Sequence, residues 1–149
     1  MQKTITIALF ACAVVAGPVF ASQSAQMHVS VEVIARTIFT VDSQPSSVTL
    51  TSYDVARGYI DVPSAVAFHV RSNAANGYAV QFQPVSGPFT QAQVSWGSTT
   101  ATVSNDASFV AQPYQQGTTF GSMTVRLAVA PGTQPGSYAW PLSVGADSL

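Results

Sequence analysis

The fold is decided by residues 66–82, which read VAFHVRSNAANGYAVQF. Apolar residues occupy every second position of residues 66–70, and they do so again in residues 78–82. This period of two is typical of strands with one buried face, because successive side chains of a strand point to opposite faces. The Asn76-Gly77 pair between the two runs is typical of a tight turn, so the sequence predicts that the runs pair as a hairpin.

The same alternation recurs along most of the chain. It places one apolar face on residues 27–35, made of Met27, Val29, Val31, Val33 and Ala35. Residues 123–129 and 138–144 alternate on either side of a Pro- and Gly-rich turn at 131–136, which predicts a second hairpin. Weaker strands are predicted at residues 47–51, 93–96, 101–104 and 108–111.

Helices are not predicted anywhere in the mature chain. No window shows a helical period bounded by capping residues, and Glu and Lys, the usual residues of helix surfaces, are nearly absent. Many short strands separated by Gly, Pro and Asn are typical of two packed β layers. The sequence therefore predicts an all-β chain that folds as a β-sandwich.

Composition limits the classes of function. The chain has 149 residues, of which 7% are charged and 47% are hydrophobic. This balance is the opposite of that in disordered chains, and the length suits one folded domain. The formal net charge of −1 leaves no basic stripe for a phosphate backbone, which excludes nucleic acid as a partner.

Residues 1–21 have the three-part layout of a secretory signal peptide, in which Lys3 supplies the positive start and an apolar run follows. The run is shorter than the ~20 residues of a membrane-spanning helix, so we expect no stable membrane anchor. Cleavage after Ala21 and cleavage after Ala25 are both consistent with the layout. Either cut removes Lys3 and Cys12, so we expect a secreted protein with neither lysine nor cysteine.

The residue constellations of common catalytic sites are missing from the sequence. A nucleophilic triad needs a His beside a Ser or Cys and an orienting carboxylate, and His28 and His69 are the only histidines. We interpret His69 as a solvated residue on the polar face of a strand, and His28 as part of the segment next to the cleavage site. We therefore expect no enzymatic activity, no catalytic residues and no cofactor.

Candidate metal ligands are also scattered. Zinc needs three or four clustered ligands, whereas the aspartates of the mature chain are single and are expected in turns. They are Asp42, Asp54, Asp61, Asp106 and Asp147. A calcium loop around Asp54 and Asp61 stays open as an alternative, although the spacing of an EF-hand is absent. We assign no metal site.

Two exposed aromatic residues are the candidate ligand contacts. Trp96 lies next to a predicted turn in Val94-Ser95-Trp96-Gly97, and Tyr114 lies among glutamines. Trp140 alternates with other apolar residues, so core packing is its stronger interpretation. Trp96 and Tyr114 together support one hypothesis, a self-contained secreted module that binds a carbohydrate or a surface protein.

Four stretches give the chain a resemblance to a known family. They are the alternating segment Met27–Ala35 leading into RTIFTVD at 36–42, Val48-Thr49-Leu50, FHVRSN at 68–73 followed by GYAV at 77–80, and PGTQPGSY at 131–138. Together they resemble bacterial pilin subunits of the chaperone–usher class, most closely the archaic branch that shares the spore-coat-protein-U domain. Two features depart from that family. The disulfide that usually joins the segments near Ile38 and Asn73 has no cysteines here, and residues 145–149 make a longer tail.

The resemblance implies an immunoglobulin-like sandwich that lacks one strand. In such subunits the N-terminal segment of a neighbour fills the vacant groove and adds main-chain hydrogen bonds. It implies a structural subunit of a bacterial surface fibre or coat, exported through the periplasm, with related subunits, a periplasmic chaperone and an usher as partners. The chain would then divide into a signal peptide (1–21), a donor segment (22–36) and a sandwich (37–149).

Two interpretations of the N-terminal segment remain from the sequence. Met27, Val29, Val31, Val33 and Ala35 either form the interface of a donated strand or belong to the first strand of the chain's own sandwich. An unpaired apolar edge is a liability for a secreted monomer, so either interpretation requires a partner strand. A fibre subunit needs a detachable segment and a vacant groove, whereas a binding module needs a closed sandwich and an exposed aromatic patch.

Overall fold

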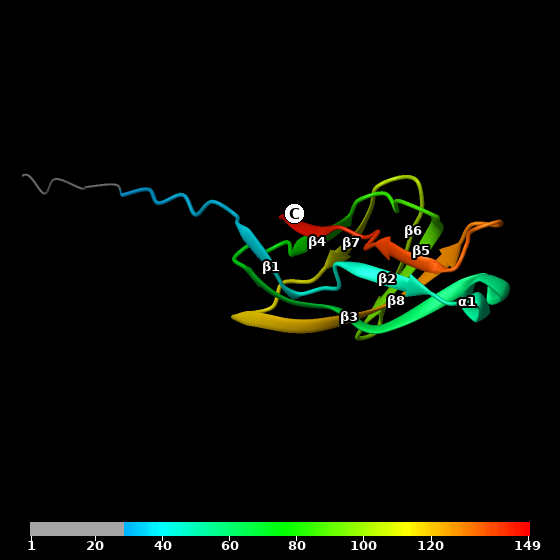
Figure 1. Ribbon diagram of the computed structural model, residues 1–149. Coiled ribbons are helices and arrows are strands. Elements are labelled where there is room, and N and C mark those ends of the chain that lie inside the picture. Colours follow the sequence, from blue (N-terminus) through cyan, green and yellow to red (C-terminus); the bar gives the residue numbers. More distant parts are fainter. Residues whose placement is uncertain (1–28) are drawn as a thin grey trace, which may run out of the picture. The chain divides into compact units, whose positions relative to one another are not determined.

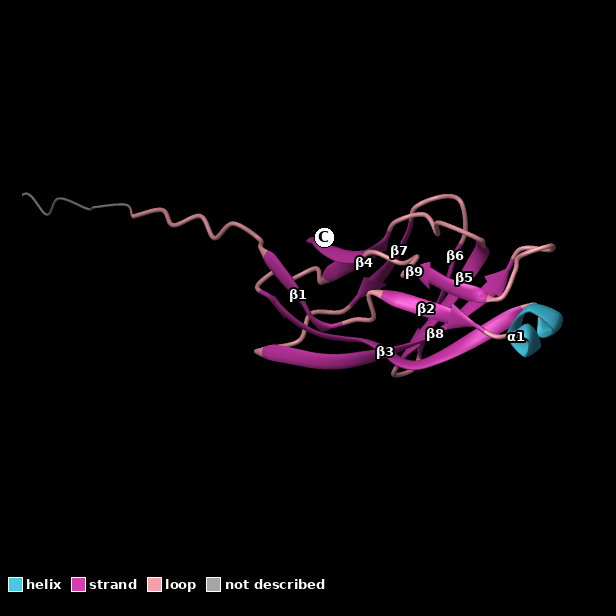
Figure 2. Cartoon of the chain, viewed as in Figure 1, coloured by secondary structure: helices cyan, strands magenta, loops and turns pink. Residues whose placement is uncertain are grey.

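A computed structural model describes residues 29–149 of the chain, and residues 33–149 form its folded unit (Figure 1). Within residues 29–149 the chain forms ten strands and one helix (Figure 2). The elements are β1 (Thr37–Ser43), β2 (Ser47–Leu50), α1 (Ser52–Arg57), β3 (Tyr59–Ser72), β4 (Tyr78–Phe82), β5 (Phe89–Trp96), β6 (Thr99–Val103), β7 (Ser108–Gln112), β8 (Thr118–Val129), β9 (Gly136–Ala139) and β10 (Val144–Ser148).

The strands form antiparallel sheets of five, three and two strands. The order is β1-β3-β8-β5-β6 in the largest sheet, β10-β4-β7 in the second and β2-β9 in the third. Alternate residues of the strands meet in one core between the sheets. The prediction of an all-β, immunoglobulin-like sandwich is therefore confirmed.

The core is built from the residues that the alternation places on one face. In the five-stranded sheet, Val66, Met123 and Val94 are fully buried, and Phe82 of β4 is fully buried opposite them. The long strand β3 leaves its sheet partner β8 briefly between Val62 and Val66, where the register shifts. Each large apolar side chain buried in this way contributes roughly 1.5–3 kcal/mol to the stability of the fold.

Both predicted hairpins are wrong in their pairing. Residues 66–70 belong to β3, which pairs with β1 and β8, whereas residues 78–82 form β4, which pairs with β7 and β10. The chain therefore crosses from one sheet to the other at residues 73–77. The same happens after β8, because residues 136–139 pair with β2 and residues 144–148 with β4. Alternation fixes which face of a strand is buried, and it does not choose the neighbouring strand.

Helix α1 corrects the prediction that the mature chain contains no helix. Thr51 caps its N-terminus, since its hydroxyl accepts a hydrogen bond from Asp54 N while the Asp54 carboxylate accepts one from Thr51 N. Gly58 ends the helix at a φ of 80°. Six residues are too few to display a helical period, which explains why the sequence pattern did not predict this helix. No helix in residues 29–149 has the length and apolarity needed to cross a membrane.

Candidate functional site

The N-terminal segment presents its apolar residues to solvent. Residues 29–36 carry no strand or helix, and Val29, Val31 and Val33 are 74%, 78% and 74% exposed. Ile34 continues the apolar surface at 79% exposed. Met27 and the predicted signal peptide lie outside the described residues. Exposed valines at alternate positions are ready to bury one face against another strand.

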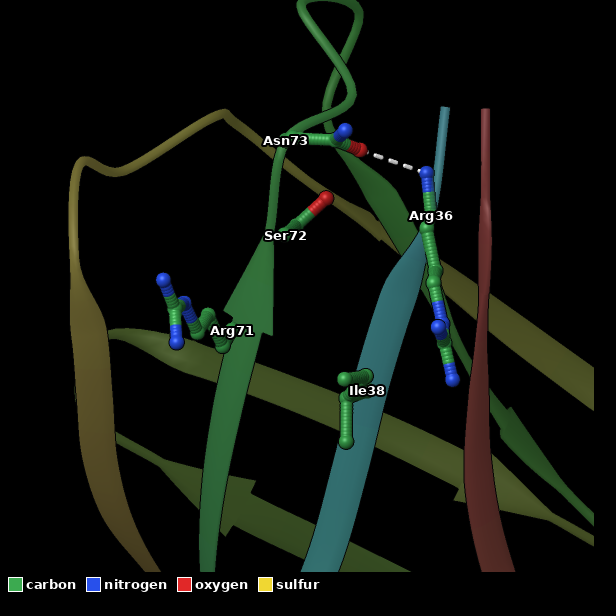
Figure 3. Close-up of a pocket in the computed structure, with 5 residues that line it drawn as sticks. All are labelled: Arg36, Ile38, Arg71, Ser72 and Asn73. Atoms are coloured by element: carbon green, nitrogen blue, oxygen red, sulfur yellow. Dashed lines mark hydrogen bonds between the residues drawn. The ribbon is translucent and has the colours of Figure 1, made fainter. Parts of the chain in front are cut away.

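Asn73 fixes the point at which this segment joins the sandwich (Figure 3). Its side chain accepts a hydrogen bond from Arg36 N–H and donates one of 3.1 Å to Ile34 O. Its own backbone N–H donates to Arg36 O at 3.1 Å. Three hydrogen bonds therefore hold residues 34–36 against the end of β3.

The outer edge of β10 has unpaired backbone groups within the described chain. Two hydrogen bonds flank its ladder with β4, from Gln83 N–H to Ser143 O and from Leu149 N–H to Gly77 O. In an antiparallel pair such bonds recur at every second residue, so the odd-numbered residues of β10 face β4. The N–H and C=O groups of Val144, Ala146 and Ser148 therefore point away from β4, toward a position that a further strand can take.

Apolar side chains line this edge without being fully buried. Val144 and Ala146 are half-buried and pack against the core, as do Phe39 and Val41 of β1. Trp140, at the break between β9 and β10, has a buried indole N–H with no hydrogen-bond partner in the described structure. The backbone N–H of Trp140 bonds to Ser46 O beside β2, so this unpaired group lies with the β2–β9 sheet. The half-buried apolar side chains of β1 and β10 are the area that a further strand can cover.

β1 is the neighbour of β10 across this open side. The Cα atoms of the two strands come within 8 Å of each other, and Thr37 Oγ1 forms a 3.1 Å hydrogen bond with Ser148 Oγ. No backbone ladder joins the two strands in the described structure. Side chains therefore bridge the gap between β1 and β10, but no backbone hydrogen bonds pair the two strands in the described structure.

The charged residues divide into paired and unpaired groups. Arg57 forms a salt bridge with Asp54 at 3.1 Å, and Arg126 forms one with Asp61 at 2.6 Å. These pairs take up the two carboxylates of the calcium-loop alternative, and no cluster of three metal-ligating residues occurs in residues 29–149. Arg36 and Arg71 make no salt bridge in the described structure, and both line a pocket of about 210 Å³ beside Asn73 (Figure 3).

The aspartates lie mainly in regular structure, contrary to the expectation of turns. Asp42, Asp61 and Asp147 are in strands and Asp54 is in α1, while Asp106 is in a loop. Asp54 is nearly buried, and hydrogen bonds from the Thr51 side chain and backbone lower the pKa of its carboxyl. Short polar side chains on strand faces bond across strands as readily as they bond within turns, which explains the difference.

Of the two histidines, His69 lies within the residues that the structure describes. Its Nδ1 lies 2.7 Å from Asp42 Oδ1 on the neighbouring strand, and its ring lies 5.7 Å from that of Phe120. Both partners of the pair are partly exposed on the outer face of the five-stranded sheet. His28 lies outside the described residues.

A second candidate site is a cleft of about 260 Å³ that includes Trp96. Phe68, Tyr78 and Phe120 also line it, so four aromatic residues from four strands meet there. Tyr114 is 46% exposed in the loop after β7 and does not line the cleft. The alternation of residues 78–82 signals that Tyr78 is buried, but nothing local in the sequence indicates that Tyr78 and Phe120 meet Trp96.

Comparisons of the chain with protein-family models, with curated proteins and with solved structures give no match.

Proposed function

We propose that the chain is a structural subunit that assembles with other copies by adding its residues 27–35 as a strand to the outer edge of β10. The observation that carries this proposal is the exposure of Val29, Val31 and Val33, three apolar side chains at the spacing of one strand face. Following the resemblance to chaperone–usher pilins, we place the assembly in a fibre or coat on a bacterial surface. A periplasmic chaperone and an usher are the proposed partners.

The edge of β10 offers what an added strand needs. The backbone groups of Val144, Ala146 and Ser148 supply main-chain hydrogen bonds, and such bonds provide affinity in strand addition. The half-buried apolar side chains of β1 and β10 supply an apolar surface on which alternate valines can pack. Burial of each valine contributes roughly 1.5 kcal/mol or more, so several together make a persistent contact.

Strand addition requires β1 to move. Neighbouring strands lie about 4.8 Å apart, so a strand inserted between β1 and β10 separates them by about 10 Å. The two strands now approach within 8 Å, and the Thr37–Ser148 hydrogen bond spans the seam. Assembly is therefore expected to break that bond and to shift the amide signals of Thr37 and Ser148.

The test compares two single substitutions on opposite faces of the N-terminal segment. Val31→Asp places a charge on the apolar face, whereas Ser30→Asp places the same charge on the adjacent polar position. We expect the wild-type chain and Ser30→Asp to form open-ended oligomers in size-exclusion chromatography with light scattering, and Val31→Asp to associate at least 10-fold more weakly. Monomeric wild-type protein, or equal effects of the two substitutions, would refute strand addition.

A substitution on β10 tests the receiving edge. Ala146→Pro removes an N–H that points away from β4, so the ladder within the subunit stays while the open edge loses a donor. We expect loss of oligomers with little change in the unfolding of the monomer. Oligomers that persist in Ala146→Pro would show that the segment binds at another place.

The aromatic cleft favours a second role, a module that binds a carbohydrate or a surface protein. The residues that line the cleft lie in residues 68–122, and the cleft borders β10 where Tyr78 pairs with Ser148. Substitutions can still test the two roles separately, because none of the residues that line the cleft belongs to residues 29–36 or to β10.

A further inference from the structure

The aromatic cleft combines apolar faces with uncharged polar groups. Of its aromatic residues, Phe68 and Tyr78 are buried, Trp96 is half-buried and Phe120 is 75% exposed. The side chains that complete the lining carry amides and hydroxyls, and none of the residues that line the cleft is charged. A ligand suited to these walls is neutral, with an apolar face and several hydroxyl or amide groups around its edge.

Tyr78 contributes a hydroxyl group to the lining of the cleft. Tyr78 is 7% exposed and lines the cleft. Its hydroxyl forms no hydrogen bond with the described residues and is not among their buried unpaired polar atoms, so it keeps contact with the solvent in the cleft. Burial raises the pKa of Tyr78, so the phenol stays neutral at physiological pH. A neutral phenol at the wall of a cleft both donates and accepts, so this hydroxyl can pair with a polar group of a bound ligand.

Two glutamines that line the cleft offer further hydrogen bonds. Thr119 Oγ1 donates to Gln115 Oε1 at 2.9 Å, which orients the amide and leaves its NH₂ group without a partner in the described structure. Gln112 Nε2 donates to Ala111 O at 3.0 Å, and its Oε1 stays without a partner among the described residues. The cleft thus presents a donor, an acceptor and a phenol that acts as either.

From this arrangement we infer that the cleft binds one ring of a neutral saccharide. A pyranose has C–H groups on a face that packs on an aromatic ring, and hydroxyls on its rim that pair with amides and a phenol. Pockets for drug-sized ligands occupy about 300–1,000 Å³, so a cleft of about 260 Å³ suits a single sugar ring. This inference rests on the ligand-binding role of the cleft and not on strand addition.

The test uses the full chain with Trp140→Phe, so that tryptophan fluorescence comes from Trp96. Free neutral hexoses and N-acetylhexosamines are titrated in one arm, with glucuronic acid and glucosamine as charged controls. Immobilised polysaccharides with the same terminal sugars form a second arm, which separates binding of free sugars from binding of chain ends. We expect a saturable change with at least one neutral sugar, and at least 10-fold weaker binding of its charged counterpart.

Substitutions then place the binding in the cleft. Tyr78→Phe removes only the hydroxyl, and Gln115→Ala removes an exposed amide, so each is expected to weaken binding by about 3- to 10-fold. Gln116→Ala, one position further along the same loop and outside the lining, is the matched control and is expected to bind as the parent does. The oligomeric state of each variant is measured in parallel, because these substitutions leave residues 27–35 and β10 unchanged.

Three outcomes would overturn the inference. The first is the absence of saturable binding to every neutral sugar in both arms. The second is binding that Tyr78→Phe and Gln115→Ala leave unchanged, or that Gln116→Ala weakens equally. The third is binding of an aromatic peptide without any binding of sugar. None of these outcomes bears on strand addition, which fails separately if the wild-type chain is monomeric.

Discussion

Gly121 makes a sharp test of the packing in the core. It lies opposite Phe68 in the β3–β8 register, and a Cβ atom added to it would lie 2.3, 2.7 and 3.0 Å from three carbons of the Phe68 ring. Ordinary contacts begin at 3.4 Å, so the ring must move by about 1 Å. The ring has little freedom, because it is 4% exposed and stacks on Phe39 with centroids 5.1 Å apart.

Two opposing effects set the cost of Gly121→Ala. Overpacking a rigid core site costs about 1–3 kcal/mol, and this site belongs near the upper end because the obstacle is a stacked ring. Replacing Gly by Ala inside a strand returns about 0.5–1 kcal/mol through lower chain entropy in the unfolded state. We therefore expect a net loss of about 2 kcal/mol in the free energy of unfolding.

Phe68→Leu provides the control. The smaller side chain vacates the space that the new methyl group enters, so Gly121→Ala is expected to cost less than about 0.5 kcal/mol in that background. The assay is urea unfolding followed by tryptophan fluorescence, in which the single substitution lowers the midpoint by about 1 M at an unchanged slope. Additive effects of the two substitutions, or a wild-type midpoint for Gly121→Ala, would refute this account of the packing.

Three further predictions concern stability. Gly77→Ala is expected to cost more than about 2 kcal/mol in urea unfolding, because Gly77 has a φ of 90° and a Cβ there would lie 2.1 Å from Gln112 O; a cost below 1 kcal/mol contradicts this. The lowered pKa of Asp54 means that its carboxylate stabilises the fold above pH about 3.8, and that this contribution is lost as the pH falls through the lowered value. Unfolding of Asp54→Asn should therefore depend less on acid pH than that of the wild type, and parallel curves would contradict it. The raised pKa of Tyr78 means that its neutral form stabilises the fold below pH 10.0, and that this is lost as the pH rises through the raised value; Tyr78→Phe should flatten the alkaline decline in stability, and an unchanged decline would contradict it.

The sequence allowed the fold class to be predicted because the relevant signal is local. A period of two is visible within five residues, and the buried residues Val66, Val80 and Val125 all follow it. Strand pairing is a different matter. Residues 66–70 pair with residues 119–123, some fifty positions away, and with β1 on the other side. The Asn76-Gly77 signal marks a crossing between sheets and not a hairpin.

The candidate sites show the same division. The sequence predicts Trp96 at the surface beside a turn, whereas its side chain is half-buried and its ring lies 5.8 Å from that of Phe82. The cleft exists only because β4 and β8 bring Tyr78 and Phe120 to Trp96 from separate sheets. The apolar face of residues 27–35 is readable from the sequence, whereas the edge of β10 that stays unpaired depends on the whole topology. Helix α1 could have been found from Thr51, Asp54 and Gly58, which are the residues of a capping box and a C-terminal glycine.

The pairing of early with late strands governs when this chain can fold. β2, at residues 47–50, finds its partner in residues 136–139, and β4 needs residues 144–148 on one side. Closing such long loops costs entropy before any contact repays it, which makes folding slow. As the polypeptide emerges from the ribosome, β2 and one side of β4 therefore stay unpaired until residues 136–148 have been made. In that interval the apolar faces of β2 and β4 are exposed, and it is the period in which a holding chaperone has the most to protect.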